Sequence, residues 1–311
     1  MEASSPSPVM PEKAVNWVNS IFIFSAHLVA IYAIVHMAAI EFSWWSLGLG
    51  VLWLGASSMS ITGGYHRLFS HQAYKAALPL RLFYLCFGAA GVQNSALKWS
   101  LDHRVHHSKV DTDEDPYNIE LGFWWAHILW IFYLEDKEID QRLVKDLVRD
   151  KFVMFQHKYY LVLAILFAAV IPFCLGLIWG DPIGAMLICG FLRLVVQWHA
   201  TFSINSFTHL FGKQPFSIEN SSRDSFVAAL ITLGEGYHNF HHRFQGDYRN
   251  GVRWYHFDPT KWFVWSLSRV GITRELRRTA RERIDQARQI VLEKKAAAAR
   301  AIDKHTPSVV N

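Results

Sequence analysis

Four apolar blocks along the chain are each long enough to cross a bilayer. They cover approximately residues 17–40, 44–64, 160–180 and 183–207. A helix needs about 20 apolar residues to span the hydrocarbon core. The first two blocks are separated only by residues 41–43, and the last two only by residues 181–182. This pattern predicts two membrane-spanning helical hairpins.

Two further features of the apolar pattern need a separate interpretation. Residues 78–97 are apolar but include two glycines, a glutamine and an asparagine, which favours a membrane-embedded or re-entrant segment. Arg193 interrupts the fourth block. Because a charge in hydrocarbon is costly, we expect this side chain to face the protein interior or a water-lined cavity.

The basic residues predict how the hairpins are oriented. The two short turns contain no Lys or Arg, whereas residues 65–158 and 209–311 contain nearly all of them. The positive-inside rule then places these two segments and both termini on the cytoplasmic side. The expected fold is all-α, with a membrane domain of four transmembrane helices and a cytoplasmic helical cap.

The ends of the chain differ from the middle in composition. Residues 1–14 contain Ser and Pro with little apolar content and are expected to form a flexible terminus, whereas residues 15–272 form the membrane domain with its cap. Residues 273–311 contain dense opposite charges at helical spacing, which predicts a solvated helix from Arg274 to about Lys304 and a tail. Cys86, Cys174 and Cys189 lie in apolar stretches without C-x-x-C spacing, so we expect small core residues rather than disulfides.

Eight of the 16 histidines fall into three clusters beside the apolar blocks. The clusters are His66-x4-His71, His103-x2-His106-His107 and His238-x2-His241-His242. Neutral imidazole is the commonest metal ligand among side chains, and one zinc ion usually takes four ligands. Eight imidazoles therefore predict a dinuclear, histidine-rich metal centre at the cytoplasmic face of a membrane.

The spacing within the clusters predicts their local structure. In both H-x-x-H-H motifs, residues i, i+3 and i+4 lie on one face of a helix and can converge. A continuous α-helix would splay His66 and His71, which are five residues apart, so we expect a bent helix end there. Asp102 and Glu235 lie next to the clusters and are expected to orient imidazoles as hydrogen-bond acceptors.

The clusters, in this order and between paired apolar blocks, resemble the histidine boxes of the membrane fatty-acid desaturases. The match covers roughly residues 40–270. Four motifs resemble the first-desaturase branch, which includes the stearoyl-CoA desaturases: Gly63-Gly64-Tyr65-His66-Arg67-Leu68, Asp102-His103-Arg104, Asp115-Pro116-Tyr117-Asn118 and Gly234-Glu235-Gly236-Tyr237-His238-Asn239.

The resemblance implies a reaction and a cofactor. It implies O2-dependent insertion of a cis double bond, at carbon 9, into a saturated acyl chain of about 16 to 18 carbons. It also implies two iron ions, an assignment that spacing alone does not make, since imidazole also suits zinc or copper. By the same resemblance, His209 is a ninth ligand and Asn205 contacts one iron through water.

The resemblance also assigns an acyl tunnel. It implies that Gln93, Trp99 and Thr201 shape the bend of the tunnel at the oxidised carbons. Leu54 and Ser58 correspond to its far end, where side-chain size limits chain length. Asn94 matches a polar position that contacts coenzyme A.

The chain departs from the animal acyl-CoA enzymes after the Asp115-Pro116-Tyr117-Asn118 motif. Those enzymes have two adjacent arginines there for the coenzyme A phosphates, whereas this chain has Ile119, Glu120 and Leu121. Arg and Lys provide strong charge-assisted bonds to phosphate. Their loss slightly favours a phospholipid acyl chain over acyl-CoA, with an acyl carrier protein thioester as a further option.

The electron donor is expected to be a separate protein such as cytochrome b5 or ferredoxin, because no haem-binding His-Pro-Gly-Gly motif occurs in the sequence. The net charge of +5 would suit an acidic donor and anionic lipids alike. Nothing points to a nucleic acid as a partner.

Two rival functions stay open at this level. A related di-iron membrane hydroxylase or alkane monooxygenase would insert oxygen instead of forming a double bond. A metal transporter could also use membrane histidines, although transport sites usually lie near the bilayer midplane. The clusters here lie at the predicted cytoplasmic edge.

Overall fold

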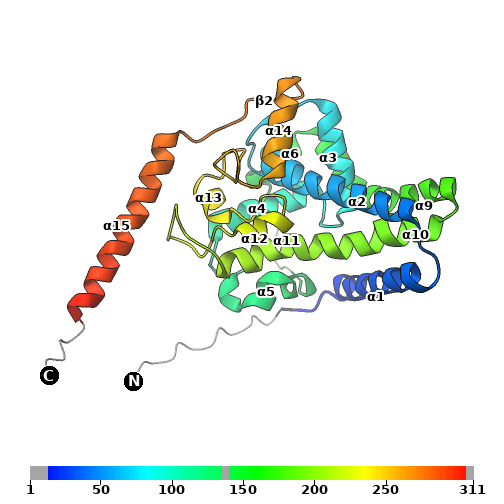
Figure 1. The fold of residues 1–311 in the computed structure, drawn as a ribbon, viewed down its shortest axis with the longest axis horizontal. Helices are drawn as coiled ribbons and strands as arrows, with labels where there is room; N and C mark the ends of the chain where they lie inside the picture. Colours follow the sequence, from blue (N-terminus) through cyan, green and yellow to red (C-terminus); the bar gives the residue numbers. More distant parts are fainter. Residues whose placement is uncertain (1–12, 135–139, 306–311) are drawn as a thin grey trace.

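The computed structural model describes residues 13–134 and 140–305 and contains four helices long and apolar enough to cross a membrane. They cover Trp17–Ala39 (α1), Trp44–Ser70, Tyr160–Trp179 and Pro182–Leu210. Each differs by only a few residues from the predicted block, except that the second and fourth extend further at their C-terminal ends. In Figure 1 the spans lie together at one end of the molecule.

Three of the spans combine several helix types. The second consists of α2 (Trp44–Met59) and the π-helix η1 (Ser60–Ser70). The third and fourth contain, in order, α8 (Tyr160–Ile165), η5 (Leu166–Val170), α9 (Ile171–Gly176), η6 (Leu177–Trp179), α10 (Pro182–Leu187), η7 (Ile188–Leu192) and α11 (Arg193–Leu210).

The remaining elements form a cap beside the spans. They are β1 (Lys75–Ala76), α3 (Leu78–Ala90), α4 (Ala96–Lys109), η2 (Ile119–Leu121), α5 (Phe123–His127), η3 (Leu129–Phe132), η4 (Gln141–Val144), α6 (Lys145–Val148), α7 (Lys151–Lys158), α12 (Phe226–Ile231), α13 (His238–Arg243), α14 (Pro259–Arg269), β2 (Thr273–Arg274) and α15 (Arg281–His305). With 13 residues, α3 is shorter than a membrane span. Its proposed embedding in the membrane stays a prediction.

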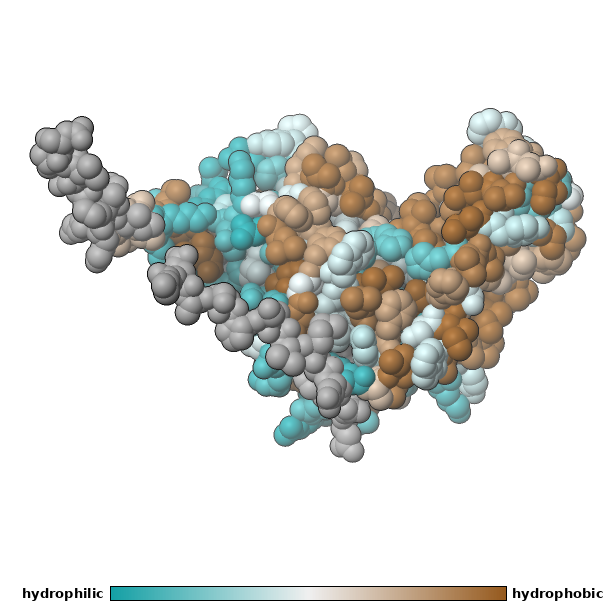
Figure 2. All heavy atoms as spheres, turned by 90° about the horizontal axis from the view of Figure 1, so that it is seen from below, coloured by the Kyte–Doolittle hydropathy of each residue, from teal (hydrophilic) through white to brown (hydrophobic). Residues whose placement is uncertain are grey.

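The surface of the spans is apolar, as a bilayer requires. Large side chains such as Ile31, Leu52 and Leu161 are exposed on them. Figure 2 shows hydrophobic side chains over the end formed by the hairpins and more hydrophilic ones over the cap. Several polar side chains in the spans are buried instead, among them Ser57, Arg193 and Gln197. Arg193 is 2% exposed and donates to the carbonyl oxygens of Cys189 and Ala90, which confirms that it faces the interior.

The helix around the first histidine cluster differs from our expectation of a bent end. Ser60–Ser70 continues α2 as a π-helix, and the backbone N–H of His71 donates to the carbonyl of His66, 3.1 Å away. A π-helix closes its hydrogen bonds between residues five apart. Residues five apart therefore lie on the same face of a π-helix. His66 and His71 converge without a bend, so the prediction of a bend was wrong.

The C-terminal helix begins seven residues later than predicted. Thr273 and Arg274 form the short strand β2, which pairs with β1, and Arg277 donates its N–H to the carbonyl of Ala73. These contacts occupy backbone groups that a helix would use. The helix is also not solvated all round, because Ile284 packs with Phe216 and Phe240. Of the predicted flexible terminus, residues 1–14, the first 12 lie outside the described residues, as does the end of the tail, residues 306–311.

Candidate metal centre

The nine histidines singled out from the sequence converge in two groups. The first contains five imidazoles and the second four, and within each group the ligand atoms lie within 4.8 Å of one another. The groups are His66, His71, His103, His107 and His241, and His106, His209, His238 and His242. Each H-x-x-H-H motif lies on one helix, α4 or α13, as predicted. Both motifs contribute to both groups.

The spacing of the ring nitrogens fits two metal ions. In the first group, the Nε2 atom of His241 lies 2.9 Å from that of His66 and 2.9 Å from that of His107. In the second, the Nε2 atom of His238 lies 3.1 Å from that of His209 and 3.0 Å from that of His242. Two nitrogens bound at right angles to one ion, about 2.1 Å from it, lie about 3.0 Å apart. Each group therefore has donor atoms at the separation that a shared ion requires.

The protonation state of these rings also suits a metal. Burial, reinforced by the neighbouring imidazoles, lowers the pKa values of His103, His107, His238, His241 and His242 well below their ordinary value. Imidazoles in this environment are neutral at pH 7, and only a neutral ring has a lone pair to give to a metal.

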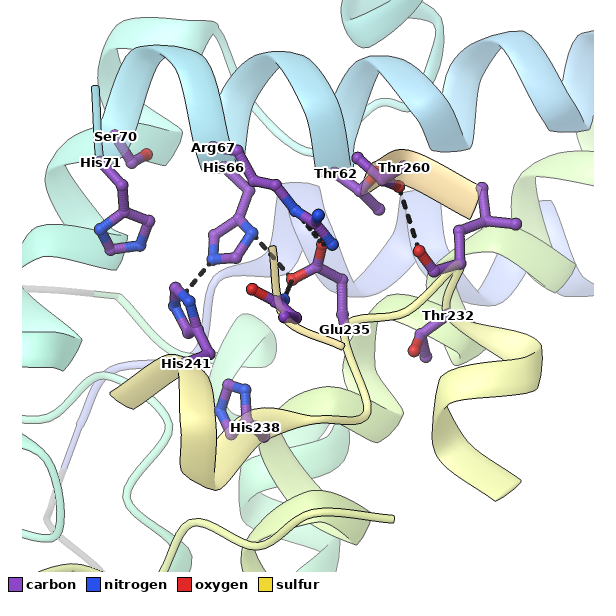
Figure 3. A network of polar contacts seen from close by, with 12 residues as sticks. Thr62, His66, Arg67, Ser70, His71, Thr232, Glu235, His238, His241 and Thr260 are labelled. Atoms are coloured by element: carbon purple, nitrogen blue, oxygen red, sulfur yellow. Dashed lines mark hydrogen bonds and ion pairs between the residues drawn. The ribbon is translucent and has the colours of Figure 1, made fainter. Parts of the chain in front are cut away.

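A buried ion-pair network fixes His66 (Figure 3). Oε2 of Glu235 lies 2.8 Å from Nδ1 of His66, so the Nε2 atom of this ring is the one that faces its group. Arg67, 1% exposed, donates to Oε1 of Glu235 through Nε and Nη2, at 3.1 and 2.8 Å. Its Nη1 atom donates to Asp258 at 3.2 Å and to the carbonyl of Tyr248 at 2.9 Å. Glu235 thus has a polar contact with an imidazole, as expected, but the imidazole belongs to His66 rather than to the nearby His238.

The charges in this network stabilise the ionised form of Glu235. Burial alone would raise the pKa of this carboxyl, but Arg67 and His66 outweigh it and lower the pKa to about 2. Asn250 also donates to Oε2, 2.6 Å away. The carboxylate therefore stays charged over the physiological pH range.

Two further acceptors were missed from the sequence. Both carboxylate oxygens of Asp115 lie 2.9 Å from Nδ1 of His106, and the hydroxyl oxygen of Ser221 lies 2.6 Å from Nδ1 of His209. Asp115 belongs to a motif that was noted only for its family resemblance, whereas Ser221 has no sequence signal. Asp102 forms an ion pair with Lys98 one turn away on α4. Its expected effect on His103 stays a prediction.

A cavity of about 630 Å³ reaches one side of the histidine groups. His66, His103, His106 and His238 line it. The other lining residues come mainly from α1, η1, η3 and α11, and include apolar side chains such as Phe22. A mostly apolar cavity that ends at a candidate metal centre suits a long, flexible hydrocarbon.

The three residues expected at the tunnel bend form one unit beside the histidines. The amide of Gln93 donates to the hydroxyl of Thr201 at 3.1 Å, and the indole N–H of Trp99 donates to the Gln93 carbonyl oxygen at 3.4 Å. Trp99 stacks on His103 with ring centroids 4.9 Å apart. All three side chains line the cavity. They can therefore position a substrate against the histidine groups.

The other predicted substrate and metal contacts fall in the same region with one exception. Ser58, Asn94 and Asn205 also line the cavity. Leu54 is half-buried on α2, one turn before Ser58, and is not among the lining residues. Its role stays a prediction.

The remaining histidines include a hydrogen-bonded series outside the two groups. His199 of α11 contacts His27 of α1 at 3.1 Å and His127 of α5 at 3.0 Å, and His127 contacts Ser206 at 2.9 Å. These contacts join α1, α5 and α11. Because His199 uses both ring nitrogens in opposite directions, the series does not converge on a point as metal ligands would.

Comparisons with known proteins find relatives over most of the chain. The model of the fatty acid desaturase family matches residues 42–269. A protein named "Probable acyl-CoA desaturase" from Schizosaccharomyces pombe is 46% identical over 264 residues, which cover 84% of this chain and 54% of that protein. Human "Stearoyl-CoA desaturase" is 32% identical over 277 residues, which cover 86% of this chain and 76% of that protein.

A relative whose name refers to a stearoyl-lipid matches over most of its length. The "sn-1 stearoyl-lipid 9-desaturase" of Anabaena variabilis is 32% identical over 264 residues, which cover 83% of this chain and 92% of that protein. By contrast, the chain spans about half the length of the matched Schizosaccharomyces pombe and Saccharomyces cerevisiae proteins, 54% of each.

Proposed function

This chain belongs to the fatty acid desaturase family, and we propose that it inserts a cis double bond at carbon 9 of a saturated acyl chain of about 16 to 18 carbons. The observation that carries the proposal is the cavity beside the histidine groups. Gln93, Trp99 and Thr201 form a hydrogen-bonded unit in its wall, directly against His103. An acyl chain held there has one pair of methylenes opposite the metal centre.

The nine histidines would hold two iron ions, with Asn205 as a partner through water. Bound iron would supply the oxidising power, since no side chain removes hydrogen from an unactivated methylene. The overall reaction consumes O2, two electrons and two protons, and releases two molecules of water. The chain's own residues orient the ligands, as Glu235 and Asp115 do for His66 and His106, and the apolar walls exclude bulk water.

The acyl carrier is proposed to be a membrane lipid. Among the described residues that line the cavity, Lys98 is the single lysine or arginine, and it already pairs with Asp102. Ile119, Glu120 and Leu121 add no positive charge where animal acyl-CoA enzymes have arginines. Coenzyme A phosphates would therefore find few charge-assisted contacts.

Expression in a host without its own desaturase tests the reaction and the carrier. The expected product is an acyl chain with a cis double bond at carbon 9, which appears in phospholipid before any thioester pool after a pulse of labelled stearate. A hydroxylated product would refute desaturation. A double bond at another carbon would refute only the proposed position, and early appearance of the labelled unsaturated product in acyl-CoA would refute the lipid carrier.

Ser58→Phe should shorten the accepted chain. Ser58 lines the cavity from α2, and an added ring in a packed space costs about 1–3 kcal/mol in strain. The ratio of C16 to C18 products should therefore rise by about 5-fold or more, measured by fatty-acid analysis. Leu54→Phe is the matched variant on the same helix and tests whether this half-buried residue also limits the chain. An unchanged ratio in Ser58→Phe would place the tunnel end elsewhere.

The proposed topology has both termini and the metal centre in the cytoplasm, because the turns between paired spans lack Lys and Arg. Single cysteines introduced as Glu41→Cys and Ser266→Cys, after removal of Cys86, Cys174 and Cys189, test it. An impermeant maleimide should label the first in intact cells and the second only after permeabilisation. Labelling of both from the same side would contradict this orientation.

A further inference from the structure

The acyl cavity has a polar side chain in its wall beyond the tunnel bend. Gln197 of α11 lies four residues before Thr201, so the rise of an α-helix places it about 6 Å further from His209. It lines the cavity and is 1% exposed. Ser58 of α2, the expected far end of the tunnel, also lines the cavity. An acyl chain that passes the bend therefore meets a buried glutamine amide.

Two donors fix the orientation of this amide. Its Oε1 atom accepts from the hydroxyl of Ser57 at 2.8 Å and from Nη1 of Arg193 at 2.9 Å. The reversed amide would aim its NH2 group at the guanidinium, which has no acceptor. Because the oxygen and the nitrogen of an amide point in different directions, these bonds turn Nε2 of Gln197 away from Arg193.

The Nε2 atom of Gln197 is buried and has no hydrogen-bond partner among the described residues. A Cβ atom at Gly91 would lie 3.3 Å from this nitrogen and 3.5 Å from Cδ1 of Ile61, a residue that lines the cavity. The free donor therefore lies beside the stretch of wall that Ile61 forms. A buried donor without a partner is unfavourable, so an acceptor in the cavity next to it would be stabilised.

Arg193 makes the amide a stronger donor. The guanidinium is 2% exposed and, among the described residues, donates to neutral oxygens, namely the carbonyls of Cys189 and Ala90 and Oε1 of Gln197. A cation bound to Oε1 polarises the whole amide, and this effect is larger in a dry interior than in water. Arg193 itself does not line the cavity. A neutral oxygen therefore suits the site better than a carboxylate, which would lose its hydration without reaching the cation.

We propose that Ser57, Ser58, Arg193 and Gln197, called the polar end below, bind an oxygen atom near the methyl end of an acyl chain, so that the enzyme accepts ω-hydroxyacyl substrates. The substrate hydroxyl accepts from Nε2 of Gln197, and Ser58 adds a hydroxyl that can donate or accept. Hydrogen is still removed only from carbons 9 and 10, with the same consumption of O2, electrons and protons. This proposal rests on the proposed desaturase function, because it concerns the chain that the reaction desaturates.

The test compares heptadecanoate with 16-hydroxyhexadecanoate, a chain of equal length in which a hydroxyl replaces the terminal methyl. Both are fed together to the desaturase-deficient host that expresses the full chain. Hydrolysis of the total lipids makes the result independent of the acyl carrier, and mass spectrometry gives the desaturated fraction of each chain. The ratio of the hydroxyacyl fraction to the heptadecanoyl fraction is compared between variants, so differences in uptake cancel.

Gln197→Met removes the donor from a side chain of similar length and should lower this ratio by about 5-fold or more. The control Gln289→Met makes the same change on the exposed surface of α15, where Gln289 donates to Glu293, and should leave the ratio unchanged. Because each ratio is internal to one variant, a general loss of expression or activity does not alter it.

Gln197→Glu tests the direction of the hydrogen bond, since a carboxylate still accepts from Ser57 and Arg193 but has no donor for the substrate. It can accept from the substrate hydroxyl, so the ratio for 16-hydroxyhexadecanoate should stay within about 2-fold of the wild type. The ether oxygen of 15-methoxypentadecanoate only accepts, and the ratio for this chain should fall by about 5-fold or more. If Gln197→Met gives no product, these two ratios decide.

The outcomes separate the polar end from the proposed function. Wild-type protein that desaturates neither chain would refute the proposed function. Wild-type protein that desaturates heptadecanoate alone would overturn the polar end and leave the proposed function intact. Ratios that the Gln197 variants do not change would do the same, because the amide would then be satisfied by water rather than by the acyl chain.

Discussion

Replacement of His241 or His106 by alanine should abolish desaturation and lower the iron content below two ions per chain. His241 lies within 2.9 Å of two other imidazole nitrogens in the group of five, and His106 belongs to the group of four. Loss of a residue that only orients a ligand typically costs about 10–100-fold in metal affinity or activity. Removal of a ligand itself should cost more. Iron is measured by mass spectrometry alongside product formation.

The matched control is His199→Asn on α11. His199 is exposed and lies on the same helix as His209, but it faces His27 and His127 instead of either group. This variant should keep its iron and its activity. Wild-type activity in His241→Ala or His106→Ala would refute the assignment of that residue. Because a foreign host can insert zinc, metal identity and activity must be measured on the same preparation.

Arg67→Met should strongly destabilise the protein and the metal centre together. Arg67 is buried between Glu235 and Asp258, both also buried. Loss of one partner from a buried ion pair typically costs about 3–5 kcal/mol, because the other charge stays uncompensated. Glu235 would also lose the two hydrogen bonds that fix it against His66. We therefore expect a lower midpoint of thermal unfolding in detergent and a lower iron content.

Lys75→Met is the control for Arg67→Met. Lys75 pairs with Glu275 on the surface, where the two side chains are 72% and 63% exposed. Such pairs contribute about 0–1 kcal/mol, so the unfolding midpoint should hardly move. Equal midpoints for the two variants would show that the buried network contributes little to stability.

The parts of the fold that follow from local pattern were predictable from the sequence. The lengths of the apolar blocks located the four spans, and the cost of a charge in hydrocarbon predicted that Arg193 faces the interior. The H-x-x-H-H spacing placed each triplet on one helix. The spacing does not indicate which clusters contribute imidazoles to the same group. The structure mixes rings from both H-x-x-H-H motifs within each group, and this requires the packing of α4 against η1 and of α13 beside them.

The contacts around the imidazoles were less predictable for the same reason. Glu235 is three residues from His238, yet it contacts His66, 169 positions earlier in the chain. Ser221 reaches His209 from a loop with no distinctive motif. The start of α15 was predicted too early because charge spacing does not reveal that Thr273 and Arg274 pair with β1. Each of these contacts depends on tertiary structure that a single sequence does not display.

The π-helix at Ser60–Ser70 constrains which insertions and deletions this chain can tolerate. Removal of one residue between His66 and His71 would leave them four apart, a spacing that an ordinary α-helix places on one face. The pair could then still converge. Removal of one residue from α2, before Ser60, would instead keep the spacing of five but turn the following segment by about 100° about the helix axis. Among diverging sequences, a gap inside the first histidine cluster should therefore be compatible with the site, whereas a gap in α2 should not.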